Sequence, residues 1–301
     1  MNLHSEHRLD DSAARVWNSD AVAFLRNLDP ASVDLIITSP PYFIGKEYDS
    51  SKCAKDFLRE IKRVKRWMVR ALKPGGSLCW QVGNHVKDGV LTPLDAIIAG
   101  EFFTNSYLNL RNRIIWTFNH GAHASMRFSG RHETILWYTK GEASTFNLDG
   151  VRVPQIYPGK RHYKGPRKGE WSGNPLGKNP GDVWDIGDIW GIPNVKANHV
   201  EKTEHPCQFP TALVRRLVVA LSPPGGLVVD PYAGSATTAV ASLLENRNFA
   251  GSDIDLKYLQ IAESRLQSLV NGNLQVREDI PVHMPTGKEK VAKRPPHFIC
   301  V

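Results

Sequence analysis

Near the amino end of the chain, polar and aromatic residues directly follow an apolar stretch. Residues 33–38, VDLIIT, have the near-continuous apolar character of a strand covered on both faces, and the stretch ends at Ser39-Pro40-Pro41-Tyr42. The prolines fix φ and remove backbone donors, which leaves one hydroxyl and one aromatic ring at the strand end. These residue types predict a binding or catalytic site. The alternative is a Pro-Pro turn with Tyr42 packed in the core.

A second buried strand with a polar end lies in residues 228–238, VVDPYAGSATT. Asp230 closes the strand, Gly234 permits a tight turn, and residues 235–238 open a helix whose first N–H groups have no partner within the helix. In an open α/β sheet, ligands bind at the carboxyl ends of strands. The turn has neither the GK[ST] of a phosphate-binding P-loop nor a GxGxxG pattern, so a nucleoside triphosphate and a dinucleotide are both disfavoured.

A third acid, Asp253, ends the next expected strand in GSDID. It follows Asp230 by 23 residues, near the separation at which an acid binds ribose hydroxyls in nucleotide-binding sheets. Either acid alone could be a helix cap or a turn residue. Together, on strands expected to be neighbours, they predict a site for a nucleoside-bearing ligand.

The elements that position these residues alternate between strands and helices, which predicts an α/β fold with a doubly wound, mostly parallel sheet. Residues 54–72 predict an amphipathic helix with Phe57, Ile61, Val64 and Met68 on its buried face, and we interpret its many basic residues as a solvated face. The other expected strands are 14–20, 77–83, 111–118, 132–140, 227–230 and 249–255, and the other expected helices are 21–28, 210–222, 234–246 and 256–270.

The 301 residues carry a net charge of +8, concentrated in one region. Residues 150–182 hold seven Lys or Arg, two acidic residues and three interleaved aromatics, and residues 141–200 as a whole lack hydrophobic periodicity. This pattern predicts a loop-rich insert that binds a polyanion, with a solvated, disordered loop as the alternative. The four isolated cysteines, and the lack of an apolar run of roughly 18–20 residues, favour an intracellular protein outside the membrane.

Taken together, these motifs resemble those of the DNA amino-methyltransferases, which methylate an exocyclic base nitrogen with S-adenosylmethionine. Ser39-Pro40-Pro41-Tyr42 matches their [DNS]PP[YFW] motif, and residues 230–237 are similar to DPFxGxGT. The order, catalytic motif before cofactor motif, resembles the β group. The resemblance spans residues 20–269 and implies a Rossmann-like methyltransferase fold. It divides the chain into a catalytic half (14–140), a target-recognition insert (141–200), a cofactor-binding half (201–272) and a loosely ordered basic tail (273–301).

The resemblance also implies roles for individual residues. Ser39, Pro40, Pro41 and Tyr42 would be catalytic, Asp20 would contact the cofactor adenine, and Asp253 would hold its ribose. Ala236 replaces the second glycine of the family turn, which is tolerable if its φ is negative. The full set of residues assigned to the cofactor is Asp20, Ser39, His205, Phe209, Pro210, Asp230, Pro231, Tyr232, Ala233, Gly234, Ser235, Thr237 and Asp253.

The resemblance gives the opening motif a mechanism. The Ser39 hydroxyl and the Pro40 carbonyl would accept hydrogens from the target amino group and favour a pyramidal nitrogen aimed at the methyl donor. Tyr42 would stack on a base flipped out of the duplex.

The identity of the base stays open between two readings. SPPY is more frequent in cytosine-N4 enzymes, whereas residues 130–140 and 195–210 resemble solitary bacterial adenine methylases, so we expect adenine N6, with cytosine N4 as the alternative. RNA or protein glutamine as the substrate, or a non-catalytic DNA-binding role, are more remote readings.

The expected partner is double-stranded DNA, no metal is expected, and the expected compartment is the bacterial cytosol or nucleoid. A homodimer is expected, with residues 54–72 or 100–130 as candidate interfaces. The residues expected to bind DNA are Lys160, Arg161, Lys164, Arg167, Lys168 and Lys178.

Overall fold

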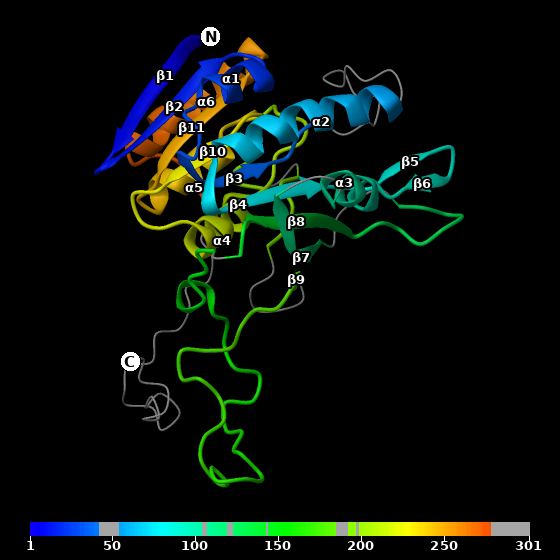
Figure 1. Ribbon diagram of the computed structural model, residues 1–301, viewed down its shortest axis with the longest axis vertical. Coiled ribbons are helices and arrows are strands. Elements are labelled where there is room, and N and C mark those ends of the chain that lie inside the picture. Colours follow the sequence, from blue (N-terminus) through cyan, green and yellow to red (C-terminus); the bar gives the residue numbers. More distant parts are fainter. Residues whose placement is uncertain are drawn as a thin grey trace.

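A computed structural model describes residues 1–41, 54–103, 107–118, 123–142, 144–184, 192–196 and 199–277. In this part of the chain, nine strands form one sheet in the order β1-β2-β11-β10-β3-β4-β8-β7-β9 (Figure 1). The strands are β1 (Asn2–Leu9), β2 (Ser12–Asn18), β3 (Val33–Thr38), β4 (Leu72–Val82), β7 (Leu108–Thr117), β8 (His132–Lys140), β9 (Val183–Trp184), β10 (Leu227–Asp230) and β11 (Asn248–Asp253), with a separate hairpin of β5 (His85–Lys87) and β6 (Val90–Thr92).

The five central strands, β2, β11, β10, β3 and β4, are parallel, and the pairs β4–β8, β8–β7 and β1–β2 are antiparallel. The predicted mostly parallel sheet is confirmed. The two predicted halves of the methyltransferase domain share this sheet, because β3 pairs directly with β10. Their carboxyl ends therefore lie side by side at one sheet edge.

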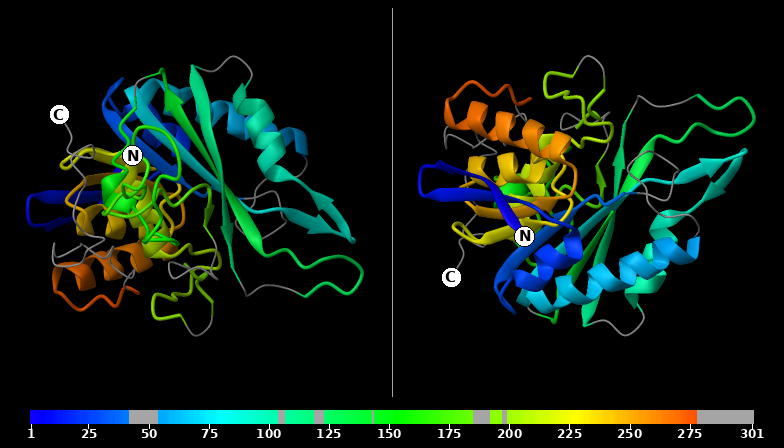
Figure 2. Two further views of the ribbon diagram at one scale, coloured as in Figure 1. Left: turned by 90° about the horizontal axis from the view of Figure 1, so that it is seen from below. Right: turned by 90° about the horizontal axis from the view of Figure 1, so that it is seen from above.

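Helices cover both faces of the sheet (Figures 1 and 2). The core on one face gathers residues of α1 (Ala21–Asn27), α2 (Ala54–Ala71) and α3 (Leu94–Phe103). The cores on the other face gather residues of α4 (Thr211–Leu221), α5 (Thr237–Leu244) and α6 (Leu256–Val270). Neighbouring residues of β3 serve opposite faces, Ile36 toward the α2 side and Ile37 toward the α4 side, as the period of a strand requires.

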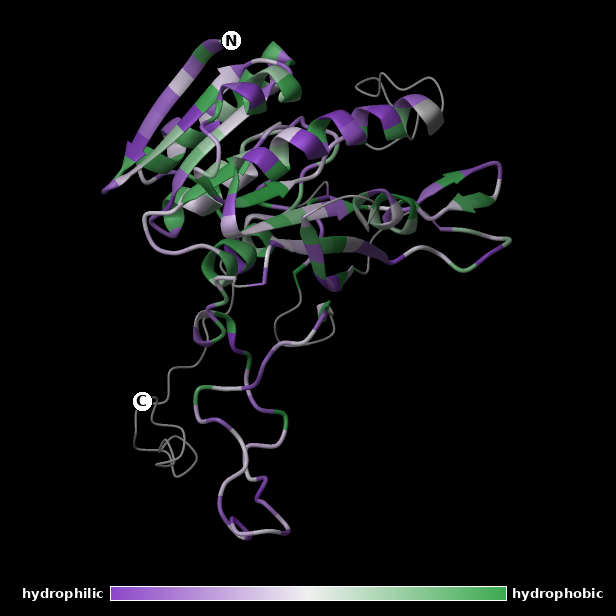
Figure 3. Ribbon diagram, in the orientation of Figure 1, coloured by the Kyte–Doolittle hydropathy of each residue, from purple (hydrophilic) through white to green (hydrophobic). Residues whose placement is uncertain are grey.

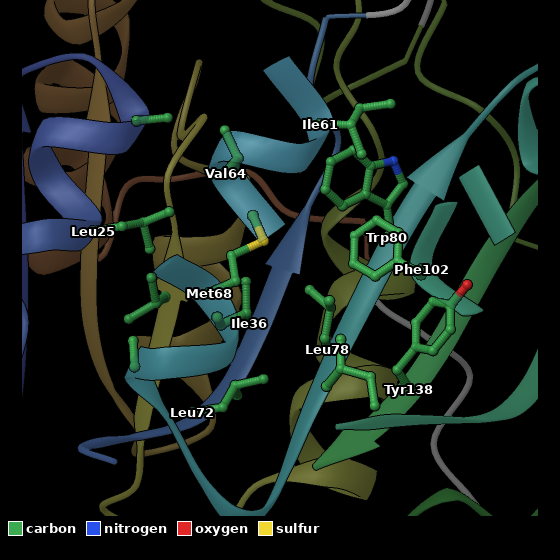
Figure 4. Close-up of a cluster of buried hydrophobic side chains, with 14 of the residues drawn as sticks. Leu25, Ile36, Ile61, Val64, Met68, Leu72, Leu78, Trp80, Phe102 and Tyr138 are labelled. Atoms are coloured by element: carbon green, nitrogen blue, oxygen red, sulfur yellow. The ribbon is translucent and has the colours of Figure 1, made fainter. Parts of the chain in front are cut away.

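Figure 4 shows the core beneath α2, where the predicted apolar stripe of that helix is buried against the sheet. Met68 and Val64 lie over Ile36, and each of the three is at most 1% exposed. Farther along the sheet, Phe102 packs edge-on against Trp80 with ring centroids 5.2 Å apart. The sequence patterns missed one helix, α3, and four strands, which are β1, β5, β6 and β9.

The basic insert forms an arm that extends away from the sheet (Figure 1), and Figure 3 colours it mostly hydrophilic. Its described part contains one short 3-10 helix (Asp149–Val151) and the short strand β9, and the isolated bridges Val153–Lys178 and Arg161–Trp171 hold its two sides together. The predicted boundaries between the four regions of the chain, after residues 140, 200 and 272, stay predictions. Most of the predicted tail (278–301) lies outside the described residues. Across the described ranges, no helix combines the length and apolar character that a membrane span needs.

Candidate functional site

A cavity of about 570 Å³ lies at the carboxyl ends of β3, β10 and β11. All the residues that the resemblance assigns to the cofactor line it, except Asp230 and Pro210. Ser39, Pro40 and Pro41 line the same cavity, whereas Tyr42 lies outside the described residues. The structure thus brings one end of the catalytic motif and the cofactor motif into a single space.

Asp230 is almost completely buried (1% exposed) and braces the floor of this cavity. Its Oδ1 accepts hydrogen bonds from the Thr38 hydroxyl at 2.9 Å and the Tyr232 N–H at 3.0 Å, and its Oδ2 accepts one from the Thr238 hydroxyl at 2.8 Å. Burial raises the pKa of this carboxyl to about 6, against the lowering effect of these donors. Asp230 therefore ties the end of β3, the turn after β10 and the start of α5 together.

The turn after β10 depends on glycine at one position. Gly234 has φ +49°, and a Cβ added there would lie 2.8 Å from Nε2 of His205. The His205 ring also packs edge-on against Tyr258, with ring centroids 4.4 Å apart, and its Nδ1 accepts the Cys207 N–H at 3.3 Å. The backbone of the turn and the His205 ring thus pack as closely as a hydrogen at Cα allows.

Ala236 also departs from the expectation for this turn. Its φ is +57°, in the left-handed region, and it is the N-cap of α5. The condition under which a methyl group would be unstrained, a negative φ, is therefore not met. The predicted helix start at residue 234 shifts to Thr237 for the same reason, because Gly234 and Ala236 both leave the right-handed helical region.

Two further carboxylates face the cavity. The Oδ2 of Asp253 accepts the Gly234 N–H at 2.9 Å and its Oδ1 accepts the Asp255 N–H at 2.9 Å, while burial raises its pKa. Asp20 caps α1, and its Oδ1 accepts the N–H groups of Val22 and Ala23 at 3.1 and 3.0 Å. Within the described residues, its Oδ2 accepts no hydrogen bond, so that oxygen is available to a ligand.

Trp80 completes the wall beside the catalytic motif, because β4 pairs with β3 in the register Thr38–Trp80. Its Nε1 is buried and has no hydrogen-bond partner in the part of the chain that the structure describes. The α2 helix adds Glu60 and Arg63, an ion pair at 2.9 Å that also lines the cavity. Both side chains stay open to solvent, with 59% of Arg63 and 45% of Glu60 exposed, as the interpretation of the α2 charges as a solvated face expects; that interpretation did not foresee that they also line the cavity.

Sequence reasoning also missed Arg265. It lies on the buried stripe of α6, and its Nη1 donates to the Ser235 carbonyl at 2.5 Å and the Thr237 hydroxyl at 3.0 Å. Burial lowers its pKa to about 10. The sequence did hold a signal for this residue: Arg265 is a charged residue that stands three residues after Ala262 and four before Leu269, on the apolar face of the helix.

The arm carries the predicted DNA-binding residues. Lys160, Arg161, Lys164 and Lys178 line a second cavity of about 750 Å³, which lies entirely within the arm. Arg167 and Lys168 are exposed on the same loop. The guanidinium of Arg161 lies 4.0 Å from the ring centroid of Trp171, so a basic and an aromatic side chain are fixed together. Among the described side chains, no group of three or more His, Cys, Asp or Glu is placed to hold a metal ion.

A family model described as "DNA methylase", which covers N6 and N4 methyltransferases, matches residues 33–264. The chain belongs to this family. It is 44% identical over 249 residues to the type II methyltransferase M.BglII of Bacillus subtilis, which covers 82% of this chain and 67% of that protein. It is 31% identical over 264 residues to the DNA adenine methyltransferase YhdJ of Escherichia coli K12, which covers 86% of this chain and 84% of that protein.

Solved structures of DNA methylases have the same fold as this chain. The cytosine-N4-specific PvuII DNA methyltransferase matches with a TM-score of 0.67 at 17% identity, over 91% of this chain and 96% of that one. A putative DNA modification methylase from Thermus thermophilus, TTHA0409, solved with S-adenosyl-L-methionine, matches with a TM-score of 0.61 at 28% identity, over 86% of this chain and 95% of that one. The methylase family and the Rossmann-like fold expected from the sequence are confirmed.

Proposed function

We propose that this DNA methylase binds S-adenosylmethionine in the cavity at the carboxyl ends of β3, β10 and β11, and methylates an exocyclic amino group of a base flipped out of double-stranded DNA. One observation supports this most strongly: Ser39-Pro40 and the Gly234 turn line a single cavity. The Thr38–Asp230 hydrogen bond fixes the two strand ends that carry them.

The residues present fit this cofactor. The Gly234 turn and the His205 ring that packs against it both line the cavity, and Asp253 offers carboxylate oxygens to ribose hydroxyls. Asp20 lines the same cavity, and its oxygen that accepts no hydrogen bond from the described residues can accept one from the adenine amino group. When bound, the cofactor supplies an electrophilic methyl group on a sulfonium.

The residues of the catalytic motif must then make the target amino nitrogen a better nucleophile. An exocyclic amino group is a poor nucleophile, because its lone pair is delocalised into the ring. The Ser39 hydroxyl and the Pro40 carbonyl accept its hydrogens and favour a pyramidal nitrogen with its lone pair in line with the methyl. Stacking of Tyr42 on the base stays a prediction.

Adenine N6 is the base we propose first, supported by the similarity to a named adenine methyltransferase over most of both chains. Cytosine N4 is the second candidate, favoured by the serine at the first position of the motif. One hydroxyl can accept one N–H from either amino group, so the geometry of Ser39 does not discriminate between the bases.

The test is methylation of genomic DNA with labelled cofactor, followed by mass spectrometry of the nucleosides. N6-methyladenine is the expected product, and N4-methylcytosine would overturn the choice of base but keep the reaction. Bound cofactor with no modified nucleoside would overturn the reaction and favour a non-catalytic DNA-binding role.

The remaining assignments belong to the same proposal. The six basic residues of the arm bind DNA phosphates, and the predicted insert (141–200) reads the target sequence. The protein forms a homodimer through residues 54–72 or 100–130, and it acts where bacterial DNA lies, in the cytosol or nucleoid. Sedimentation of the purified protein with and without a DNA duplex tests the dimer.

A further inference from the structure

The connection between β7 and β8 ends in an apolar tip. Met126 is 95% exposed and Phe128 is 100% exposed, although both are large apolar side chains. Burial of either side chain against a partner would be favourable, because each would remove a large apolar surface from water.

This tip has a defined shape. The Phe118 N–H donates to the Arg131 carbonyl at 2.9 Å and closes the base of the loop. The Ala124 N–H donates to the Ser129 hydroxyl at 3.1 Å and closes the apex, which leaves residues 126–128 projecting. The loop therefore presents Phe128 on a local turn.

Strand order places this tip on the catalytic side of the sheet. Because β8 is antiparallel to β4, its first residues lie at the carboxyl end of β4, where Val82 pairs with Thr134. The β7–β8 loop thus leaves the same sheet edge as the Ser39 motif, on the adjoining strand β3. Figures 1 and 2 show the loop beside the β5–β6 hairpin, whose Val90 is 70% exposed, while the basic arm projects in another direction.

The charge around the tip matches a nucleic acid. Residues 119–132 contain no acidic residue, and Arg127 and Arg131 flank the aromatic ring in the sequence. Proteins that open the DNA stack insert apolar side chains such as Phe or Met between base steps and hold the adjoining phosphates with basic residues. A dimer contact through the end of the candidate interface 100–130 would bury the same apolar side chains, but the two arginines would then meet a surface of a protein with net charge +8, so DNA is the occupant we favour for residues 126–128.

We propose that residues 126–128 form a wedge that enters the DNA stack at the target site, with Phe128 filling the space that the flipped base leaves. This inference rests on the proposed function, because it assumes that the target base leaves the duplex. Phe128 is then a positioning residue: it stabilises the opened duplex and does not touch the reacting atoms.

The experiment compares Phe128→Ala with wild type in single-turnover methylation of two duplexes that carry the methylated site found in genomic DNA. One duplex is fully paired, and the other has a mismatched base opposite the target, which makes flipping easier. Phe128→Leu tests whether an apolar side chain suffices. Tyr107→Ala is the matched control, because Tyr107 is an 81% exposed aromatic residue just before β7, at the opposite end of that strand from the loop.

Phe128→Ala should slow methylation of the paired duplex by about tenfold or more and leave the mismatched duplex within about twofold of wild type. Phe128→Leu and Tyr107→Ala should stay close to wild type on both duplexes. Equal rates for Phe128→Ala and wild type, an equal loss on both duplexes, or a change in oligomeric state alone would each overturn the wedge. A wild-type protein that methylates neither duplex would instead overturn the proposed function, and the wedge with it.

Discussion

At Gly234, one hydrogen atom decides whether the turn after β10 can form. The residue has φ +49°, and the Nε2 atom of His205 lies 2.8 Å from where a Cβ would be. Gly225 also has a positive φ, +71°, but no atom of the described residues lies within 4 Å of its Cβ position. Alanine at Gly225 would therefore introduce backbone strain alone, whereas alanine at Gly234 would introduce the same strain together with a steric clash.

We expect Gly225→Ala to lower the free energy of unfolding by about 1 kcal/mol, because an alanine is strained at positive φ. Gly234→Ala should cost more, because its methyl group also displaces His205, and it should weaken binding of S-adenosylmethionine by about tenfold or more. Denaturant titration and calorimetry measure the two effects. Equal losses of stability, with cofactor affinity unchanged in both variants, would contradict the role given to the turn.

Asp230 offers a test by pH. Its pKa is raised to about 6 from 3.8, so the native state holds this proton more tightly than the unfolded state does. The contribution of Asp230 to stability is therefore largest at low pH and is lost as the pH rises through about 6. Asp230→Asn can keep the hydrogen bonds of Thr38 and Tyr232 to one oxygen, and it removes the titration.

We expect the stability of wild type relative to Asp230→Asn to fall by about 1 kcal/mol between pH 5 and pH 7.5. Denaturant titration of both proteins across this range measures the difference, in which the titration of other groups cancels. Parallel profiles for the two proteins would show that Asp230 carries no raised pKa.

At the scale of elements, the patterns that decide burial were readable. The near-continuous apolar run of β3 and the stripe on α2 predicted both elements, because a strand covered on both faces is apolar at most positions and a helix buried on one side has a 3.6-residue period. The β1 strand was missed because it carries a polar residue at most positions and is an edge strand that pairs only with β2 among the described strands. The α3 helix is apolar on nearly all sides, so it has no period that would mark it.

The site was predictable as a set of motifs, and the roles of some residues within it were not. Motif spacing found Asp230 and Gly234, but only the structure places Asp230 outside the cavity as a brace. Trp80 and Glu60 reach the cavity through strand pairing and helix placement, which no local pattern encodes. The left-handed φ of Ala236 likewise follows from the turn that its neighbours require.

Arg265 connects α6 to the turn that begins α5. Its loss should disturb the cofactor site, because its bonding partners Ser235 and Thr237 line the cavity. Arg265→Met removes the donors to Ser235 and Thr237 and leaves the nearby buried Glu201 carboxylate without this cation. We expect a loss of about 3 kcal/mol in stability, together with weaker cofactor binding. Denaturant titration measures the first effect and calorimetry the second.

Arg247→Met is the matched control for this change. Arg247 is also buried, but it bonds Ser222 and Glu245, away from the cavity. The Arg247→Met variant should be less stable than wild type and should bind S-adenosylmethionine with unchanged affinity. If both variants bind S-adenosylmethionine as wild type does, Arg265 stabilises the fold alone.

At the scale of the whole molecule, the cavity and most of the positive charge lie in different parts of the structure. The compact sheet holds the cavity, while the arm carries five of the net eight positive charges in residues 150–182 and stands away from the sheet (Figure 1). Contacts to phosphates release counterions, so each contact appears as a salt-dependent term in DNA affinity. The salt dependence of DNA affinity can therefore show whether the arm or the rest of the protein contacts the phosphates.

The double variant Lys160→Gln/Lys164→Gln should weaken DNA binding, and it should reduce the slope of log affinity against log salt by about 2, close to one unit per lost phosphate contact. Anisotropy titrations of one duplex between about 50 and 200 mM salt measure the slope. The matched control, Arg8→Gln/Arg15→Gln, removes the same charge from the β1–β2 hairpin at the far edge of the sheet and should leave the slope near that of wild type. An equal fall in slope for the two double variants would mean that net charge, and not the arm, draws DNA to the protein.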